Sequence, residues 1–333
     1  MTQQAFLKSI SQYFNTGCLT RFDKILSLLK PTLVLKRNAP IIKNNFSGIE
    51  QKGIRSSQTF EISHYTGSDK TALQIGSYLR KNLSAELSEA FVHGSIATDE
   101  KIAYSDFDGL VIIKNQVFES IDSIIHVAEH LSKAYSIMIK GDPLQHHGWF
   151  VVTEKEFSDW PSDYFPPEIL NHSRSILNGK TKLHLQFTEK IPESKASLVK
   201  MVKSIERTLS TGRFPDNAYQ LKSLFSEFML LPALFIQAQT GKGIYKKESF
   251  AEAKKYVSSD LWKVMDEVSA FRLNWNLTSG LVLPEEPVLV TPAVKKRQVA
   301  KSVRIPAGMQ SKLTNHLRED MLRLSRFFIN QVP

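Results

Sequence analysis

Two aspartates stand two residues apart at the head of an apolar run, Asp106-Phe107-Asp108-Gly109 and onward to Ile113. This run predicts a buried strand over 106–113. Side chains alternate along a strand, so Asp106 and Asp108 share one face, with their Cα atoms roughly 6.6–7 Å apart. Two carboxylates on an otherwise apolar strand repel each other and are costly to bury, and a divalent cation removes both costs. The pair therefore predicts a metal site with Asp106 and Asp108 as its ligands.

A glycine and a serine follow the preceding predicted strand, Glu89–His93. Gly94 lets the backbone approach a ligand closely and adopt dihedral angles that other residues avoid. Ser95 adds a hydroxyl beside exposed N–H groups, and a helical turn that starts here would direct its N-terminus at an anion. The Gly94-Ser95 turn is therefore predicted to bind phosphate oxygens.

The two halves together have a recognisable spacing: Gly94-Ser95, ten residues, then Asp106-Phe107-Asp108 with Ser105 before it. This pattern over about residues 70–155 resembles the nucleotidyltransferase superfamily related to DNA polymerase beta. The resemblance implies that Asp106 and Asp108 bind two magnesium ions and that Gly94 and Ser95 contact a nucleoside triphosphate, with ATP favoured. It further implies transfer of the nucleoside monophosphate to a hydroxyl, with release of pyrophosphate.

The sequence departs from the superfamily at the third carboxylate, which the next strand of the sheet usually supplies. That strand is predicted at Gly148–Thr153 and contains no acid. Three alternatives remain open. His147 or His146 takes the position as ligand or base, Asp142 reaches in from the preceding loop, or full activity has been lost. We take His147 as the candidate catalytic residue.

The surrounding pattern predicts an α+β fold, a mixed sheet with flanking helices followed by an α-helical domain. Helices are predicted at 70–83 and 119–138, and again at 194–211, 217–239, 248–256, 258–275 and 310–330. Residues 1–35 are predicted to be helical, 37–60 to be an irregular linker or surface arm, and 280–306 to be an extended connection. We predict three parts: a basic segment with its linker (1–60), a catalytic domain (61–165) and a helical domain (166–333).

The helical half offers basic residues that could contact a nucleotide. A glycine-containing segment between two predicted helices carries Lys242 and Lys246, with Tyr245 between them, and Lys222 lies on the preceding helix. Cations of this kind can neutralise a triphosphate, and a tyrosine ring can stack on a base. Lys222, Lys242 and Lys246 are therefore candidate nucleotide-binding residues, against the alternative of a solvated basic loop.

The chain is basic, with a formal net charge of +10 over 333 residues. Residues 1–60 hold nine Lys/Arg and two Asp/Glu, and a second cluster comprises Lys295, Lys296, Arg297, Lys301 and Arg304. Basic excess favours anionic partners, although a solvated surface also explains it. The single cysteine, Cys18, permits no intrachain disulfide. The N-terminus has no secretory pattern and the longest apolar stretch, 228–238, is too short to span a bilayer, so we expect a cytoplasmic protein without a membrane partner.

Two classes of function follow. The first is a magnesium-dependent nucleotidyltransferase whose acceptor hydroxyl belongs to a small molecule, a protein side chain or an RNA end. The second is a binding module that keeps the fold, has lost catalysis with the third carboxylate, and binds nucleic acid or a protein through its basic segments. A toxin–antitoxin or defence role, known among members of the superfamily, is a third possibility.

Overall fold

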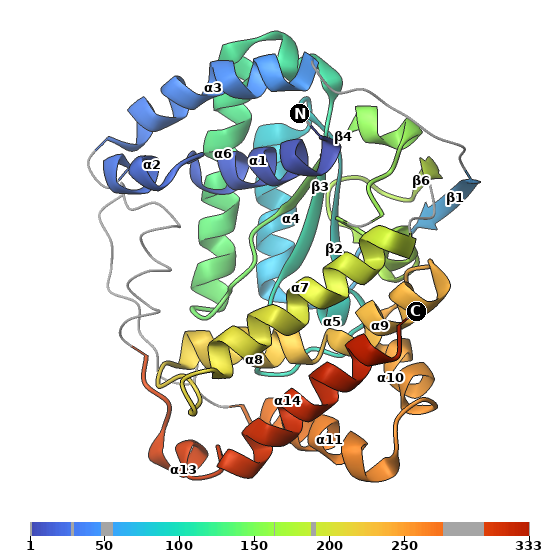
Figure 1. Ribbon diagram of the computed structural model, residues 1–333. Helices are drawn as coiled ribbons and strands as arrows, with labels where there is room; N and C mark the ends of the chain where they lie inside the picture. Colours follow the sequence, from blue (N-terminus) through green and yellow to red (C-terminus); the bar gives the residue numbers. More distant parts are fainter. Residues whose placement is uncertain are drawn as a thin grey trace.

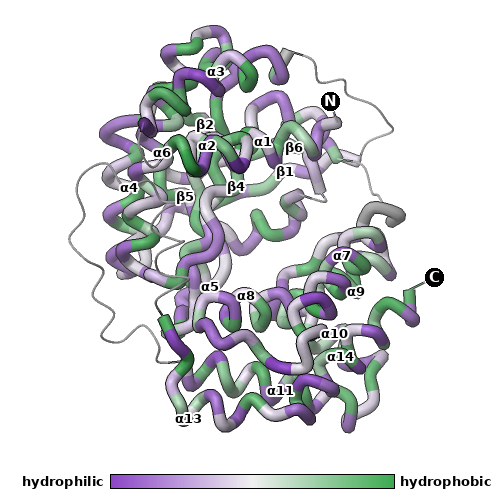
Figure 2. Tube along the Cα trace, turned by 60° about the vertical axis from the view of Figure 1, so that its left-hand side comes forward, coloured by the Kyte–Doolittle hydropathy of each residue, from purple (hydrophilic) through white to green (hydrophobic). Residues whose placement is uncertain are grey.

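The computed structural model describes residues 2–27, 30–47, 56–162, 164–187, 191–275 and 303–332. Two lobes are visible, one built around a sheet and one built from helices (Figure 1), and Figure 2 shows the same division from another side. Each lobe has its own apolar core. One core joins residues from Phe6 to Leu185, and the other joins Tyr104 and Leu144 to helices between Leu198 and Val332.

A four-stranded sheet with the order β4-β3-β2-β5 forms the centre of the first lobe. Its strands are β2 (Leu87–His93), β3 (Asp108–Ile113), β4 (Phe150–Thr153) and the two-residue β5 (Arg174–Ser175). Strand β2 is antiparallel to β3 and β5, whereas β3 and β4 are parallel. The sheet is therefore mixed, and with the helices around it and the helical lobe it confirms the predicted α+β class.

Two long helices support this sheet. Helices α4 (Lys70–Leu83) and α6 (Ile121–Gly141) pack against each other, and both were predicted from the spacing of apolar residues. Each begins at a residue whose side chain accepts a hydrogen bond from a first-turn N–H group, Asp69 for α4 and Ser120 for α6. The short 3-10 helix η1 (Asn115–Glu119) connects β3 to α6.

The N-terminal segment belongs to the sheet lobe and contains α1 (Gln3–Thr16), α2 (Arg21–Leu26) and α3 (Pro31–Ser47). Helices α1 and α3 pack on α6, and α1 also contacts β4. The prediction of an irregular segment at 37–60 is wrong, because α3 and strand β1 (Ser56–Ile62) occupy most of it. The Pro40 inside α3 and the polar residues around it concealed this helix in the sequence. The proposed domain boundaries stay a prediction.

A separate two-stranded antiparallel sheet pairs β1 with β6 (Thr181–Phe187). Neither of these strands was predicted from the sequence, and β5 was not predicted either. The pairing of β1 with β6 joins positions more than 100 residues apart, such as Thr59 and His184, and local patterns carry little information about such partners. Two 3-10 helices, η2 (Glu154–Ser158) and η3 (Pro167–His172), lie between β4 and β5 of the four-stranded sheet.

The second lobe contains α7 (Ile191–Leu209), α8 (Ala218–Phe228), α9 (Leu231–Thr240), α10 (Lys246–Lys254), α11 (Ser259–Leu273), α13 (Ala307–Gln310) and α14 (Asn315–Asn330). The helix predicted at 217–239 is two helices, since α8 ends at Phe228 and Pro232 lies in the first turn of α9. Ala218–Thr240 is long and apolar enough to cross a membrane, but 72% of its most apolar window is buried inside the protein, as in a core helix. Lys295, Lys296, Arg297, Lys301 and most of the predicted connection at 280–306 lie outside the described residues.

Candidate active site

The two halves of the motif meet at one end of the sheet. Asp108 is the first residue of β3 and pairs with His93, the last residue of β2. Gly94 follows directly and begins the short helix α5 (Gly94–Ala97). Strand β3 therefore starts two residues later than predicted, and Asp106 lies in the loop before it. The structure brings Asp106, Asp108 and the Gly94-Ser95 turn into one place.

Gly94 is required at this turn for two reasons. Its φ angle is +67°, in the left-handed region that favours glycine, and a Cβ atom here would stand 2.7 Å from Oδ2 of Asp108. The backbone at Gly94 therefore lies next to the Asp108 carboxylate. The next residue, Ser95, is partly exposed.

Replacing Gly94 with alanine is expected to weaken nucleotide binding by about tenfold or more, because the new methyl group must displace the Asp108 carboxylate. Gly212→Ala is the matched control: Gly212 also has a left-handed φ, +77°, but nothing lies within 4 Å of its would-be Cβ. Both variants should lose about 1–2 kcal/mol of stability from the backbone alone. Equal nucleotide affinity in the two variants, measured with a labelled nucleoside triphosphate, would contradict the assignment of this turn.

Asp106 lies between two basic groups from different lobes. His146 Nδ1 is 2.6 Å from Asp106 Oδ2. Lys222 Nζ, from α8 of the helical lobe, contacts the other Asp106 oxygen and lies 2.5 Å from Asp142 Oδ2. The Lys222 side chain is completely buried. One lysine thus pairs with two carboxylates of the sheet lobe, and this ion-pair cluster joins the lobes at the site.

The ionisation of the two aspartates differs. Burial alone would raise the pKa of Asp106, but the hydrogen bond and charge of His146 and the charge of Lys222 outweigh burial and hold that pKa well below its usual range. Burial and the negative charge of Asp106 instead raise the pKa of Asp108 to about 7. Burial would lower the pKa of Lys222, but Asp106 and Asp142 raise it, so Lys222 stays protonated.

The cluster fits a divalent cation. Ligand atoms of Asp106, His146 and His147 lie within 4.8 Å of one another, and Asp108 is a carboxylate whose charge is disfavoured by its surroundings and by Asp106. A cation would relieve that penalty. Asp106 and Asp108 with the two histidines are therefore the residues that could hold a metal.

A carboxylate at position 148, just before the next strand, would collide with α1. Leu110 of β3 pairs with Phe150 of the parallel strand β4. Two residues earlier in each segment, the same register places Gly148 beside Asp108. A Cβ atom at Gly148 would lie 2.2 Å from Oδ1 of Asn15 in α1. All three side chains predicted as alternatives for the third position lie near Asp106: ligand atoms of His146 and His147 are close to it, and Asp142 shares Lys222 with it and interacts with it directly. The choice among them stays a prediction.

Gln145 positions both loops of the site, although it was not predicted as a site residue from the sequence. Its side chain is completely buried. It accepts a hydrogen bond from Phe107 N (2.8 Å) and donates to Phe107 O (2.8 Å) and to His147 O (2.7 Å). The backbone between the two aspartates is thereby fixed to the backbone of the histidine pair. A single glutamine in a polar loop gives no sequence signal of this role.

Tyr104 anchors the segment between the two halves of the motif in the helical lobe. Its hydroxyl contacts Lys222 O (2.5 Å) and Ser226 Oγ (2.8 Å), and its ring meets Trp275 edge-on with the centroids 5.0 Å apart. Arg272 lies over the same ring, at 4.7 Å from its centroid. The apolar Ile102-Ala103-Tyr104 run in a polar loop was an available signal for this contact.

The other predicted lysines differ in their placement. Burial and the charge of Arg272 lower the pKa of Lys246 to about 7. The negative charges of Asp108 and Asp106 act in the opposite direction. Lys246 therefore interacts electrostatically with both aspartates. Lys242 instead lines a hollow of about 380 Å³ beside β1 and η3. Tyr245 stacks on His172, with the ring centroids 3.9 Å apart.

Comparisons with known proteins add one distant likeness. No protein-family model and no curated protein matches the chain. The chain is similar in structure to a spectinomycin adenyltransferase AAD(9) from Enterococcus faecialis, solved with ATP and spectinomycin, over 77% of this chain and 99% of that chain, with 11% identity and a TM-score of 0.35. That enzyme belongs to the superfamily that the motif resembles. The likeness is too distant to assign a function to this chain.

Proposed function

We propose that the chain is a magnesium-dependent nucleotidyltransferase that moves a nucleoside monophosphate, AMP from ATP, to a hydroxyl acceptor and releases pyrophosphate. The observation that carries the proposal is the meeting of the Asp106–Asp108 pair with the left-handed Gly94 turn, where a Cβ would stand 2.7 Å from Asp108. A backbone turn for phosphates beside two carboxylates for a cation suits a metal–triphosphate complex.

Each residue of the site has a proposed role. Asp106 and Asp108 hold magnesium, which when bound would neutralise phosphate charge and favour deprotonation of the acceptor hydroxyl. Gly94 and Ser95 receive the phosphates, and Lys222 and Lys246 add positive charge from the helical lobe. His147 reaches solvent, but the protein around it and the neighbouring His146 lower its pKa. A neutral imidazole at this position can accept a hydrogen bond or a proton from the acceptor hydroxyl.

A second candidate function is nucleotide binding without turnover. Gly148 has no room for a side chain, and Lys222 already contacts Asp106. Both features favour a binding module, in which nucleotide binding changes how the two lobes meet. ATP is the proposed nucleotide in either case, because it is the most abundant triphosphate and the one that the superfamily commonly uses.

Purified protein incubated with each alpha-labelled nucleoside triphosphate, magnesium and cell extract tests the proposal. We expect label from ATP to appear in an acceptor, and we expect chelation of magnesium with EDTA to abolish transfer and added magnesium to restore it. Tight binding of ATP with no transfer to the protein or to the extract would favour the binding module. Neither binding nor transfer would overturn both candidate functions.

A further inference from the structure

The start of helix α10 contacts the sheet lobe through three side chains. Tyr245, just before the helix, stacks on His172 at the end of η3, with the ring centroids 3.9 Å apart and the rings 15° from parallel. Lys247 pairs with Glu100. Glu248 Oε1 lies 3.6 Å from His172 Nε2. We call Tyr245, Lys247 and Glu248 the α10 latch.

The chain just before the α10 latch packs closely against η3. A Cβ atom at Gly243 would stand 2.2 Å from Glu168 Oε2 and 2.7 Å from the side chain of Pro166, so a side chain at this position would push the two segments apart. Helix η3 in turn contacts α5, the short helix that begins at Gly94. The latch therefore lies on the part of the sheet lobe that carries the predicted phosphate-binding turn.

Hydrogen bonds connect the residues that the latch contacts to the Gly94-Ser95 turn. The backbone N–H of Glu100 donates to Ser95 O at 2.8 Å. The Thr98 hydroxyl lies 3.3 Å from Gly94 O and 3.2 Å from Glu100 Oε2. The Tyr245 side chain also interacts with Thr98. Thr98 and Glu100 are thus bonded to the turn on one side and to the α10 latch on the other.

The segment that follows α5 has a backbone conformation that needs such support. Asp99 has a φ angle of +57°, and a non-glycine residue keeps this left-handed conformation only where its surroundings hold it. Within the sheet lobe, Lys101 Nζ lies 2.6 Å from Asp69 Oδ2 at the start of α4. The segment is therefore attached to α4 through Lys101 and to the helical lobe through Glu100.

We propose that Tyr245 and Lys247 are positioning residues for the triphosphate: the α10 latch fixes the shape of the Gly94-Ser95 turn, and the phosphate site is complete only while the two lobes are docked. These roles rest on the proposed function, because they require that the turn binds phosphates. Tyr245 acts here through the turn and not as a platform for the base, since His172 already covers one face of its ring.

Two other roles for the same side chains lead to different measurements. A tyrosine that stacked on the base would matter for ATP but not for a ligand without a base. A lysine that attracted the phosphates directly would matter whether or not its carboxylate partner is present. A ligand that consists of phosphates alone and a variant that lacks the carboxylate therefore separate these roles from positioning.

Isothermal titration calorimetry of the full chain with magnesium–ATP and with magnesium–tripolyphosphate tests the role of Tyr245. We expect Tyr245→Ala to weaken binding of both ligands about tenfold, because loss of the ring pair releases the turn. Tyr256→Ala is the matched control. It removes a ring that meets Phe235 edge-on just beyond the other end of α10, and both affinities should stay within about twofold. Thermal melting verifies that both variants fold.

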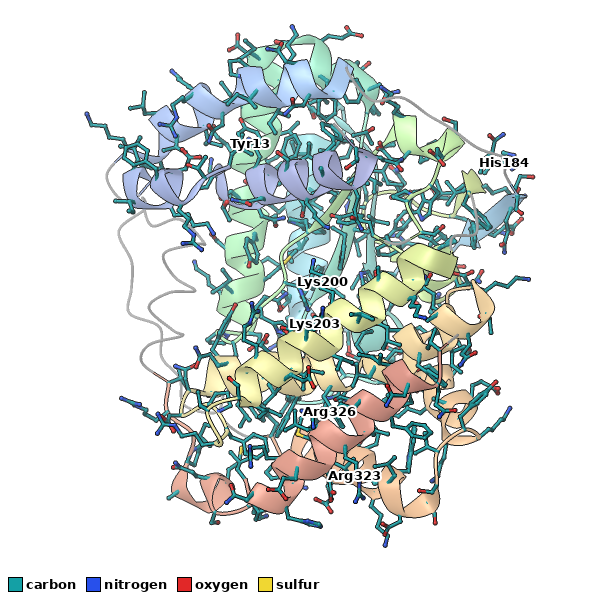
Figure 3. The ribbon with its side chains drawn as sticks, viewed as in Figure 1. Tyr13, His184, Lys200, Lys203, Arg323 and Arg326 are labelled. Carbon is teal, nitrogen blue, oxygen red and sulfur yellow. The ribbon has the colours of Figure 1, made fainter. Side chains whose placement is uncertain are left out.

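A double-mutant cycle tests the pair of Lys247 and Glu100. Lys247→Gln is expected to weaken tripolyphosphate binding about threefold, the scale of an exposed ion pair. In a Glu100→Gln background it should have no further effect, because the pair is already broken. Arg326→Gln is the control, since it breaks an exposed ion pair with Glu206 inside the helical lobe. Arg326 lies on α14, in the part of that lobe away from the sheet (Figure 3), and its loss should leave the affinity unchanged.

Three results would overturn the proposal. Weaker binding of ATP with unchanged binding of tripolyphosphate would assign Tyr245 to the base. A Lys247→Gln effect that persists beside Glu100→Gln would indicate direct attraction of the phosphates. Equal effects of the control variants Tyr256→Ala and Arg326→Gln would indicate a general loss of packing.

The proposed function fails separately from the α10 latch. A wild-type protein that binds tripolyphosphate with the expected dependence on Tyr245 and Lys247, yet transfers no label, contradicts transfer alone. A wild-type protein that transfers label while Tyr245→Ala binds both ligands normally contradicts only the positioning roles. Binding of neither ligand by the wild type would contradict the phosphate-binding turn and, with it, both proposals.

Discussion

The Asp108→Asn protein is expected to lose nucleotidyl transfer by about 10³-fold or more and yet to unfold no more readily than the wild type. Loss of one carboxylate ligand removes several kcal/mol of charge stabilisation from the transition state, and about 4 kcal/mol corresponds to 10³-fold. The free energy of unfolding should instead increase. Burial and the charge of Asp106 raise the pKa of Asp108 to about 7, so the charged carboxylate is unfavourable in the folded protein. An uncharged isostere removes that repulsion.

The pH dependence gives the stability prediction its sign. A carboxyl group whose folded-state pKa lies above its unfolded value destabilises the protein at pH values above the folded pKa, and this effect is lost as pH falls towards the unfolded pKa near 4. Chemical denaturation without metal should therefore show Asp108→Asn more stable than wild type at pH 8, with the difference shrinking towards pH 4. Asp266→Asn replaces an exposed residue on α11. It should change neither the transfer rate nor the free energy of unfolding. A variant that keeps its transfer rate, or that is less stable at pH 8, would contradict the role given to Asp108.

Replacing Lys222 with methionine is expected to lower the free energy of unfolding by about 3–5 kcal/mol, the usual cost of removing one partner from a buried ion pair. Asp106 and Asp142 would then remain without the cation that contacts both. Their pKa values in the folded variant should rise, so the folded state binds protons more readily than the unfolded state. The deficit relative to wild type should thus be largest above pH 7 and should shrink as pH falls towards 4.

Two further variants separate charge from volume. Lys263→Met, on the exposed side of α11, removes a lysine that pairs with Asp260 at the surface and should cost less than about 1 kcal/mol. Lys222→Met/Asp142→Asn should recover part of the lost stability, because it removes one of the unpaired carboxylates. Urea unfolding at pH 8 and pH 5 measures the free energy of unfolding of the wild type and of each variant. A Lys222→Met deficit that is the same at both pH values would indicate lost packing rather than lost charge compensation.

The parts of the site that the sequence predicted are those formed by neighbours along the chain. Gly94, Ser95, Asp106 and Asp108 lie on or beside two strands that pair with each other, and apolar patterning locates both strands. The long amphipathic helix α6 was predicted for the same reason: its buried residues recur every three or four positions. Such features depend on local periodicity, which a single sequence contains.

The parts that could not be predicted depend on contacts between distant segments. Gln145 acquires its role only because its loop lies beside Phe107. In the sequence, Lys222 was one of several candidate lysines, and only the structure shows that it is buried against Asp106 and Asp142. Lys242 was a similar candidate, but it lines a different hollow. Strand β6 shows the same limit, because its partner β1 lies more than 100 residues earlier in the chain.

The contact between α1 and the edge of the site limits which sequences this chain can reach by mutation. Asn15 accepts a hydrogen bond from Trp149 N at 2.7 Å and donates to Trp149 O at 2.9 Å, and it fills the space beside Gly148. A point mutation that places an aspartate at 148 would collide with Asn15, and shortening Asn15 alone would break both bonds to the strand. Acquisition of a third carboxylate therefore requires two coordinated changes with an unfavourable intermediate. Recombination that exchanges the sheet without α1 meets the same barrier, so helix and strand are expected to be inherited together.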